Sequence, residues 1–191
     1  IAVLNQRTLQ ELQGETAAND RERVAQEFMS ERMGVQRDLY EAGEQLRAVR
    51  IIASPLQRGR SIFDDMPKTT DEEWSNIAAR LALVPRTLAG YRSSLNEGTR
   101  RGLVASKRQA LEGAKQAETW SGEKSYFDGL LAQFDGRAIG QSAGLKADVE
   151  RGVNAAKFAY GEMARYMREF YAPAASEGEA SGPDRYALLA R

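Results

Sequence analysis

The side chains that could perform chemistry in this chain are carboxylates, because its 191 residues include no histidine and no cysteine. Without these two residue types there is no imidazole base, no thiolate nucleophile and no zinc site built from nitrogen or sulfur ligands. Carboxylates close together in sequence occur at Asp64 and Asp65 and again at 71–73. Carboxylates can act as general acids and bases, so these clusters are the first candidates for a site.

The two acidic clusters favour different interpretations. Residues 71–73 fall in the expected first turn of a helix, where negative charge is stabilised by the helix dipole and neighbouring side chains point in different directions. We therefore interpret them as a helix start. Asp64 and Asp65 lie beside Phe63 and Met66. A turn that holds acids next to apolar side chains either contacts a substrate or caps a helix or an arginine. No glycine-rich loop has the spacing of a phosphate-binding loop.

A helix is predicted to begin at Asp71, because Thr70 and Glu73 have the spacing of a capping box. Pro85 is expected to end or kink this helix, and the segment 96–98 to end the next one at a glycine. Apolar residues at helical spacing lie on both sides of the proline and are predicted to be core: Trp74, Ile77, Ala78, Leu81, Leu88, Tyr91 and Leu95. Arg80 lies among them and is expected to pair with an acid across the turn.

The rest of the chain is also predicted to be helical. Helices are expected over 3–15, for about 30 residues after a cap at Asn19 or Asp20, over 100–119 and over 126–134. Gly34 and Gly43 inside the second of these mark either a close helix crossing or a break. From Leu145 a heptad pattern extends to residue 170, and Pro173 is expected to stop it. We interpret this apolar stripe as intramolecular core, with an intermolecular coiled coil as the alternative.

Together these elements predict an all-α fold, an irregular bundle of about six to eight helices without a sheet. We expect a helical domain over 1–172, a mobile loop rich in small residues over 173–183, and the start of a truncated helix over 184–191. The chain begins at Ile1 without a methionine and stops within an apparent helix. We therefore expect it to be a piece of a longer protein.

The charge balance argues against nucleic acid and membrane as partners. Lysine plus arginine and aspartate plus glutamate number 27 each, which gives a formal net charge of zero. The basic residues over 100–115 are the nearest approach to a positive patch. No aromatic residue alternates with them, so they are interpreted as a solvated helix face rather than a single-strand binding surface. No apolar run reaches the roughly 20 residues that span a bilayer, and we expect a soluble chain whose compartment the sequence leaves open.

Two segments carry a resemblance to a known family. The first contains Ser54 and Pro55, the step FDDMP over 63–67, the acid-rich turn TDEEW over 70–74, and then Arg80, Leu81 and Pro85. The second is the tail SGPDRYALLAR over 181–191. In these segments the chain resembles a bacterial family known as domain of unknown function 885. The resemblance implies a mostly helical protein related to zinc metallopeptidases, whose HExxH motif lies farther along a longer chain.

The resemblance also implies how this part would serve such a protein. It would be an N-terminal helical scaffold forming one wall and part of the cap of a peptidase-like groove, with no catalytic residue or metal ligand of its own. Zinc and the catalytic glutamate would belong to the remainder of the parent chain, and the substrate would be a peptide. The candidates for contacting it are Arg60, Phe63, Asp64, Asp65 and Arg80.

The alternative hypothesis is a self-contained helical interaction module without enzymatic activity. In that case the apolar seams at 24–49 and 145–170 would pack together or recruit a partner helix. If the chain is a fragment of a longer protein instead, apolar surface meant for the missing part should remain exposed and favour self-association into a homo-oligomer.

Overall fold

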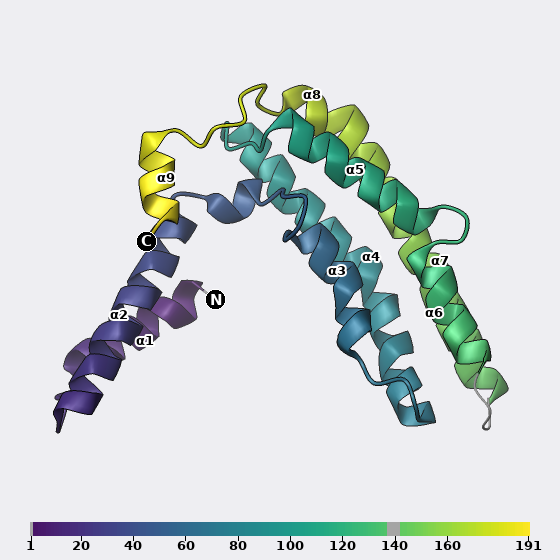
Figure 1. Ribbon diagram of the computed structural model, residues 1–191, viewed down its shortest axis with the longest axis horizontal. Coiled ribbons are helices and arrows are strands. Elements are labelled where there is room, and N and C mark those ends of the chain that lie inside the picture. The colour runs from purple at the N-terminus through teal and green to yellow at the C-terminus, as the bar shows by residue number, and fades with distance from the viewer. Residues whose placement is uncertain (1, 137–141) are drawn as a thin grey trace. The chain divides into compact units, whose positions relative to one another are not determined.

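The computed structural model describes residues 2–136 and 142–191, and in this part of the chain helices are joined by turns and loops (Figure 1). The described residues contain no β-strand, so the predicted all-α fold is confirmed. Helices α1 to α7 each have ten residues or more, in line with the predicted six to eight. The elements are α1 (Ala2–Gly14), α2 (Asp20–Glu41), the 3₁₀-helix η1 (Glu44–Arg47), α3 (Pro55–Asp65), α4 (Asp71–Arg100), α5 (Lys107–Ser121), α6 (Tyr126–Asp135), α7 (Ala143–Tyr166), the π-helical turn η2 (Met167–Tyr171), α8 (Ala172–Ala174) and α9 (Pro183–Leu189).

The chain divides into two compact units, a boundary that the sequence patterns did not indicate. The smaller unit combines residues up to Gln45 with Ala180–Arg191, and the larger unit is Leu46–Glu179. The predicted mobility of 173–183 stays a prediction.

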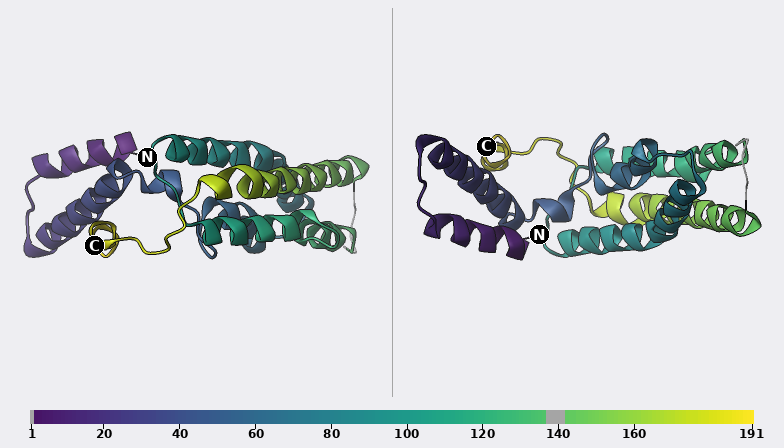
Figure 2. Two further views of the ribbon diagram at one scale, coloured as in Figure 1. Left: turned by 90° about the horizontal axis from the view of Figure 1, so that it is seen from above. Right: turned by 90° about the horizontal axis from the view of Figure 1, so that it is seen from below.

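The smaller unit has little apolar core. α1 lies along α2 (Figure 2), and Leu9 and Val35 are the buried apolar side chains among its described residues. Ion pairs join α9 to the rest of this unit: Arg185 bonds both oxygens of Glu44 at 2.8 and 2.9 Å. Polar contacts therefore contribute much of what holds this unit together.

The expected long second helix ends early. α2 stops at Glu41, and Gly43 takes the left-handed conformation with φ of 74°, which glycine adopts without steric cost. Of the two interpretations of Gly43, the break is therefore the one found.

The larger unit is built around α4 and α7, which pack along each other, with α5 against α7 (Figure 1). Trp74, Leu81 and Leu95 of α4 are fully buried, as are Val149 and Tyr160 of α7. The capping box at Thr70 forms as predicted, because its hydroxyl accepts from the Glu73 N–H at 3.2 Å while Glu73 accepts from the Thr70 N–H at 2.9 Å.

Of the two outcomes expected at Pro85, an end or a kink, the end is not found, because α4 continues through the proline. The expected end at 96–98 was wrong. The interior proline costs about 3 kcal/mol, but burial of Leu81, Val84 and Leu88 on either side of it offsets this cost. As a consequence, Arg100 closes α4, and the helix expected over 100–119 begins at Lys107 instead.

The end of α4 is a Schellman motif at Gly102, four residues beyond the glycine stop expected at Gly98. Gly102 takes φ of 71°, its N–H bonds the Thr99 carbonyl at 3.1 Å, and the Leu103 N–H bonds the Gly98 carbonyl at 2.8 Å. Gly98 itself is buried inside the helix. It is needed there because the backbone carbonyls of Leu46 and Leu103 come too close for any side chain.

The heptad stripe of α7 enters the core as predicted, except at its end. Phe170 is 62% exposed, whereas Tyr171 is 1% exposed. The reason is the π-helical turn at 167–171, which inserts an extra residue per turn and moves the buried position one residue along the chain. The helical path ends at Ala174, one residue beyond Pro173, so the expected stop is found to within a residue.

Candidate functional site

The candidate site is a groove between α3 and α4 in the larger unit, and its geometry starts at the first turn of α3. Ser54 caps this helix: its hydroxyl accepts from the Leu56 N–H at 3.3 Å, and Gln57 accepts from the Ser54 N–H at 2.9 Å. Pro55 follows as the first helical residue, a position that needs no N–H donor. The serine and proline at 54–55 therefore fix where α3 begins.

Polar contacts hold this end of α3 against α5. The Gln57 amide donates to Gln116 Oε1 at 2.6 Å, and the Gln116 amide donates to the Ile51 carbonyl at 2.9 Å. The Tyr160 hydroxyl of α7 also donates to the Leu56 carbonyl at 2.9 Å, in a buried position. One side of the groove is thus anchored to two other helices.

The groove has a volume of about 410 Å³ and is mostly apolar. Phe63 is buried and Ile62 and Leu83 are 40% and 53% exposed, so apolar surface lies open to solvent here. The apolar side chains along it are Pro55, Ile62, Phe63, Leu83, Val84 and Leu88. An open apolar hollow of this size is typical of a site for a small ligand or a short stretch of peptide.

Two guanidinium groups are the charged groups of this groove. Arg58 comes from α3 and Arg80 from α4, and no acidic side chain lines the groove with them. Both arginines are exposed, and neither has a hydrogen-bond or ion-pair partner within residues 2–136 and 142–191. The Thr87 hydroxyl, which also lines the groove, donates to the Leu83 carbonyl at 3.1 Å.

Arg60 lies outside the groove lining, in a cluster of aromatic side chains. It pairs with Asp64 at 3.0 Å, and its guanidinium lies 4.5 Å from the Tyr126 ring centroid and 5.7 Å from that of Trp120. Its Nε is buried without a hydrogen-bond partner in the described structure. Cation–π contact with the two rings and the ion pair offset the cost of this burial.

Tyr126 joins the same cluster through its hydroxyl, which donates to Asp64 Oδ1 at 2.8 Å. Burial and the adjacent Asp64 carboxylate raise the pKa of Tyr126 well above its usual range. The phenol therefore stays protonated at neutral pH and keeps its hydrogen bond to α3. This contact ties α6 to α3 and positions the helix without offering a reactive group.

The five sequence-derived candidates thus fall into separate places. Phe63 and Arg80 line the groove, while Arg60 and Asp64 belong to the aromatic cluster. Asp65 is exposed and has no hydrogen-bond or ion-pair partner among the residues described. The expectation that Arg80 pairs with an acid was wrong, because its guanidinium faces a groove lined by no acidic residue.

Sequence reasoning missed Arg58, Ile62 and Leu83 as parts of a groove. A signal for two of them was present in the spacing, because Arg58 and Ile62 are four residues apart and so share one face of α3. Which neighbouring helix that face meets could not be inferred from spacing alone.

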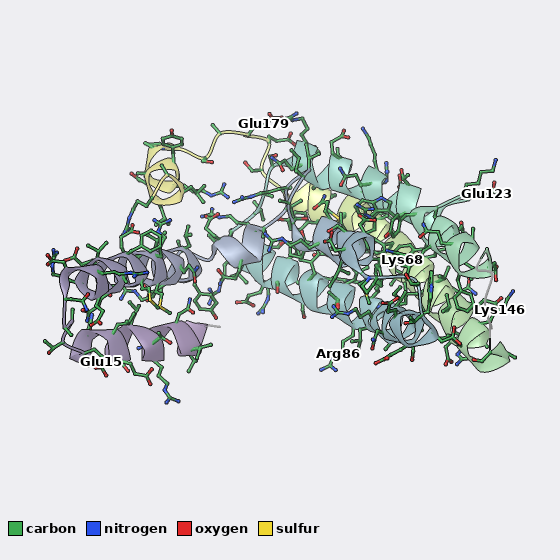
Figure 3. All side chains as sticks on the ribbon, turned by 60° about the horizontal axis from the view of Figure 1, so that its bottom comes forward. Glu15, Lys68, Arg86, Glu123, Lys146 and Glu179 are labelled. Carbon is green, nitrogen blue, oxygen red and sulfur yellow. The ribbon has the colours of Figure 1, made fainter. Side chains whose placement is uncertain are left out.

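The basic residues of α5 are paired rather than free. Lys107 bonds Glu177 at 2.7 Å, Arg108 bonds Glu179 at 2.5 Å and Lys115 bonds Glu112 at 2.6 Å. Glu179, labelled in Figure 3, belongs to the loop after α8. Acidic neighbours therefore balance this positive charge locally, as expected for a solvated helix face.

In the part of the chain that the structure describes, no group of three or more acidic side chains is placed to hold a metal ion. Nor does any described helix combine the length and apolar character needed to cross a bilayer.

Comparison with known proteins gives a family. A model of the family described as "Bacterial protein of unknown function (DUF885)" matches residues 2–191, and the chain belongs to this family. No curated protein matched the chain.

Proposed function

We propose that this member of the DUF885 family is the N-terminal helical scaffold and cap of a zinc-dependent, peptidase-like hydrolase, and that it is not catalytic by itself. The remainder of the parent chain would supply the zinc ligands, and a peptide would be the substrate. The observation that carries the proposal is the open groove between α3 and α4, whose lining can bind but cannot cleave.

The chemistry of the lining supports this division of labour. Apolar side chains and guanidinium groups provide contact area and positive charge, and a guanidinium only donates hydrogen bonds. The Thr87 hydroxyl is bonded to its own helix and has no histidine beside it as a base, since the chain contains none. The groove therefore offers recognition without a nucleophile or general base.

The zinc of the proposed hydrolase does not fit the residues present here. Structural and catalytic zinc sites use cysteine, histidine and carboxylate ligands in groups of three or four. This sequence has neither histidine nor cysteine, and the described acids form no cluster of that kind. No step of the proposed reaction is therefore assigned to this chain.

The first test measures zinc content and peptide hydrolysis of the 191-residue chain. After incubation with zinc and exhaustive dialysis, we expect substoichiometric metal and no cleavage of a mixed peptide library. Stoichiometric retained zinc or turnover of any peptide by the purified chain would contradict the proposal.

The second test concerns the natural gene product. Its intact mass and sequence should show residues beyond Arg191 that include an HExxH motif, and the complete product should cleave peptides in a chelator-sensitive manner. A natural product that ends at Arg191 would refute the scaffold proposal and favour the alternative.

The alternative, a self-contained interaction module, is favoured by apolar side chains exposed on α2. Val24 is 56%, Phe28 64% and Met29 45% exposed, and Val24 and Phe28 are four residues apart on one helix face. In this case the chain should self-associate or capture a partner helix through that face. Light scattering of the chain and of a Val24→Ser/Phe28→Ser variant tests this face, because the variant should lose any oligomer that forms through it.

A further inference from the structure

We propose that the groove between α3 and α4 binds the end of a peptide, an apolar residue that carries a free carboxylate. Such a ligand rests on the proposed function, a peptidase-like hydrolase, and specifies the chemistry of the peptide that this part of the chain would hold. The apolar lining would hold the side chain, and Arg58 and Arg80 would hold the carboxylate.

The size and polarity of the groove support an apolar residue. About 410 Å³ is at the small end of ligand sites, enough for one or two residues rather than a long segment. Ile62 and Leu83 expose apolar surface at 40% and 53%, and a ligand side chain placed between them would remove that surface from water.

The charge of the groove supports a carboxylate. Several exposed arginines of this unit are matched with acids, as Arg165 is with Glu162 at 2.6 Å and Arg168 with Glu118 at 2.5 Å. Arg50, Arg86 and Arg92 are exposed without an acid partner among the described residues, but none of them lines the groove. Arg58 and Arg80 stand without such a partner in the described residues, and both line one apolar groove. A guanidinium fits a carboxylate with two parallel hydrogen bonds, and the low-polarity surroundings strengthen that bond.

The first turn of α3 adds no competing anion site. Its Ser54 and Leu56 N–H groups are already bonded within the capping box, and Pro55 has none. Anion recognition in the groove therefore depends on the two arginine side chains, which makes it testable by substitution.

The binding test titrates the chain with three peptides while following amide NMR shifts or heat. The probes are acetyl-Ala-Leu with a free C-terminal carboxylate, the same peptide as the C-terminal amide, and acetyl-Asp-Leu-amide, which carries its carboxylate on a side chain. We expect the free acid to bind at least about tenfold more tightly than the amide, the loss typical of one charge-assisted hydrogen-bond pair. Affinity of the aspartyl peptide equal to that of the free acid would show that the carboxylate can come from a side chain, which would overturn the assignment to a peptide end.

The variant test compares Arg58→Ala/Arg80→Ala with Arg86→Ala. Arg86 lies on α4, is exposed, and points outward in Figure 3 without lining the groove, so it controls for loss of positive charge on the same helix. The double variant should lose at least about tenfold in affinity for the free acid, and Arg86→Ala should bind like the parent. Circular dichroism checks that each variant keeps its helices. Leu83→Asp is an exposed change that puts negative charge in the groove, so it should also weaken binding of the free acid.

Several results would overturn the inference. These are equal binding of acid and amide, unchanged affinity of the double variant, binding of inorganic phosphate as tight as that of the peptide, or no binding of any probe. The outcome is separable from that of the proposed function. A natural product ending at Arg191 would remove the hydrolase and leave carboxylate binding intact, whereas a failed titration would remove the ligand assignment and leave the scaffold.

Discussion

A close backbone approach at Gly98 predicts a large effect for Gly98→Ala. A methyl group at Gly98 would lie against the carbonyl oxygen of Leu46 and 2.6 Å from that of Leu103. Both atoms are backbone and cannot rotate away as a side chain would. The Leu103 segment is in addition held in place by its hydrogen bond to the Gly98 carbonyl at 2.8 Å.

The expected magnitude follows from three opposing contributions. Overpacking of a closed site costs about 1–3 kcal/mol. Distortion of the Schellman motif weakens a hydrogen bond whose net contribution is about 1 kcal/mol. Alanine is better than glycine inside a helix by about 1 kcal/mol, which opposes the first two. We therefore expect Gly98→Ala to lower the free energy of unfolding by about 2 kcal/mol.

Gly90→Ala is the matched control on the same helix. Gly90 is exposed inside α4, and a methyl group there would meet nothing within 4 Å. The only remaining effect is the higher helix preference of alanine compared with glycine, so this variant should be more stable than the parent by up to about 1 kcal/mol. The two substitutions are chemically identical, and their effects should have opposite signs.

The assay is urea unfolding followed by circular dichroism, with thermal melts beside it. For a chain of this size about 2 kcal/mol corresponds to a fall of roughly 4–8 °C in the melting temperature. A Gly98→Ala variant as stable as Gly90→Ala would refute the close approach of the Leu46 carbonyl and, with it, the placement of the segment before α3 against the end of α4.

Three further predictions test other contacts. Thr70→Ala should cost about 1 kcal/mol of stability in urea unfolding, because Thr70 and Glu73 cap α4 reciprocally; no change would mean that the helix start needs no cap. Alkaline pH should destabilise the fold, because burial raises the pKa of Tyr126 and of Tyr160 above the unfolded value of about 10. The two phenols contribute their full stabilisation below pH 10. The free energy of unfolding falls as the pH rises above 10, since the unfolded chain loses those protons first. Ultraviolet titration of tyrosinate in the folded chain checks the raised pKa values. The stability of the Tyr126→Phe variant should fall less steeply with rising pH. Glu179→Gln should change stability by less than about 1 kcal/mol, and any effect should vanish in high salt, because its pair with Arg108 is exposed.

Much of the fold could be predicted because its local signals agree with its packing. The start of α4 follows from Thr70 and Glu73, and the beginning of α9 from Pro183. The buried stripe from Val149 to Met167 follows from heptad spacing alone. Each of these depends on residues within one or two turns of each other.

The failures share a physical cause, which is long-range packing. Nothing local to Pro85 shows that burial on both sides will carry the helix through it. Nothing local to Gly98 shows that the Leu46 carbonyl passes beside it, so a glycine that looks like a helix end is a close approach instead. The π-helical turn before Ala172 likewise depends on how Tyr171 reaches the core, where its hydroxyl accepts from the Ala105 N–H at 2.9 Å.

The candidate site could be predicted from the sequence only in part, because it too depends on long-range packing. The acids at 64–65 are candidates by residue type because carboxylates can act as acids and bases, yet Asp64 is engaged by Arg60 and Tyr126. The groove itself arises from the way α3 crosses α4, and neither helix alone specifies it. Its arginines have no partner in the described residues, a property of the folded chain that the sequence does not display.

The construction of α3 decides what kind of site the groove can be. Phe63 fixes its buried side by packing edge-on against Phe127, with 6.1 Å between the two ring centroids. The hydrogen bond from the Tyr160 hydroxyl to the Leu56 carbonyl fixes the same side. Its open side carries Arg58, which nothing in the described chain restrains. A site with a fixed base and free charged groups at its rim loses little entropy on binding except at the rim. Changes at the rim should therefore alter affinity without altering stability, while changes at the base should alter both.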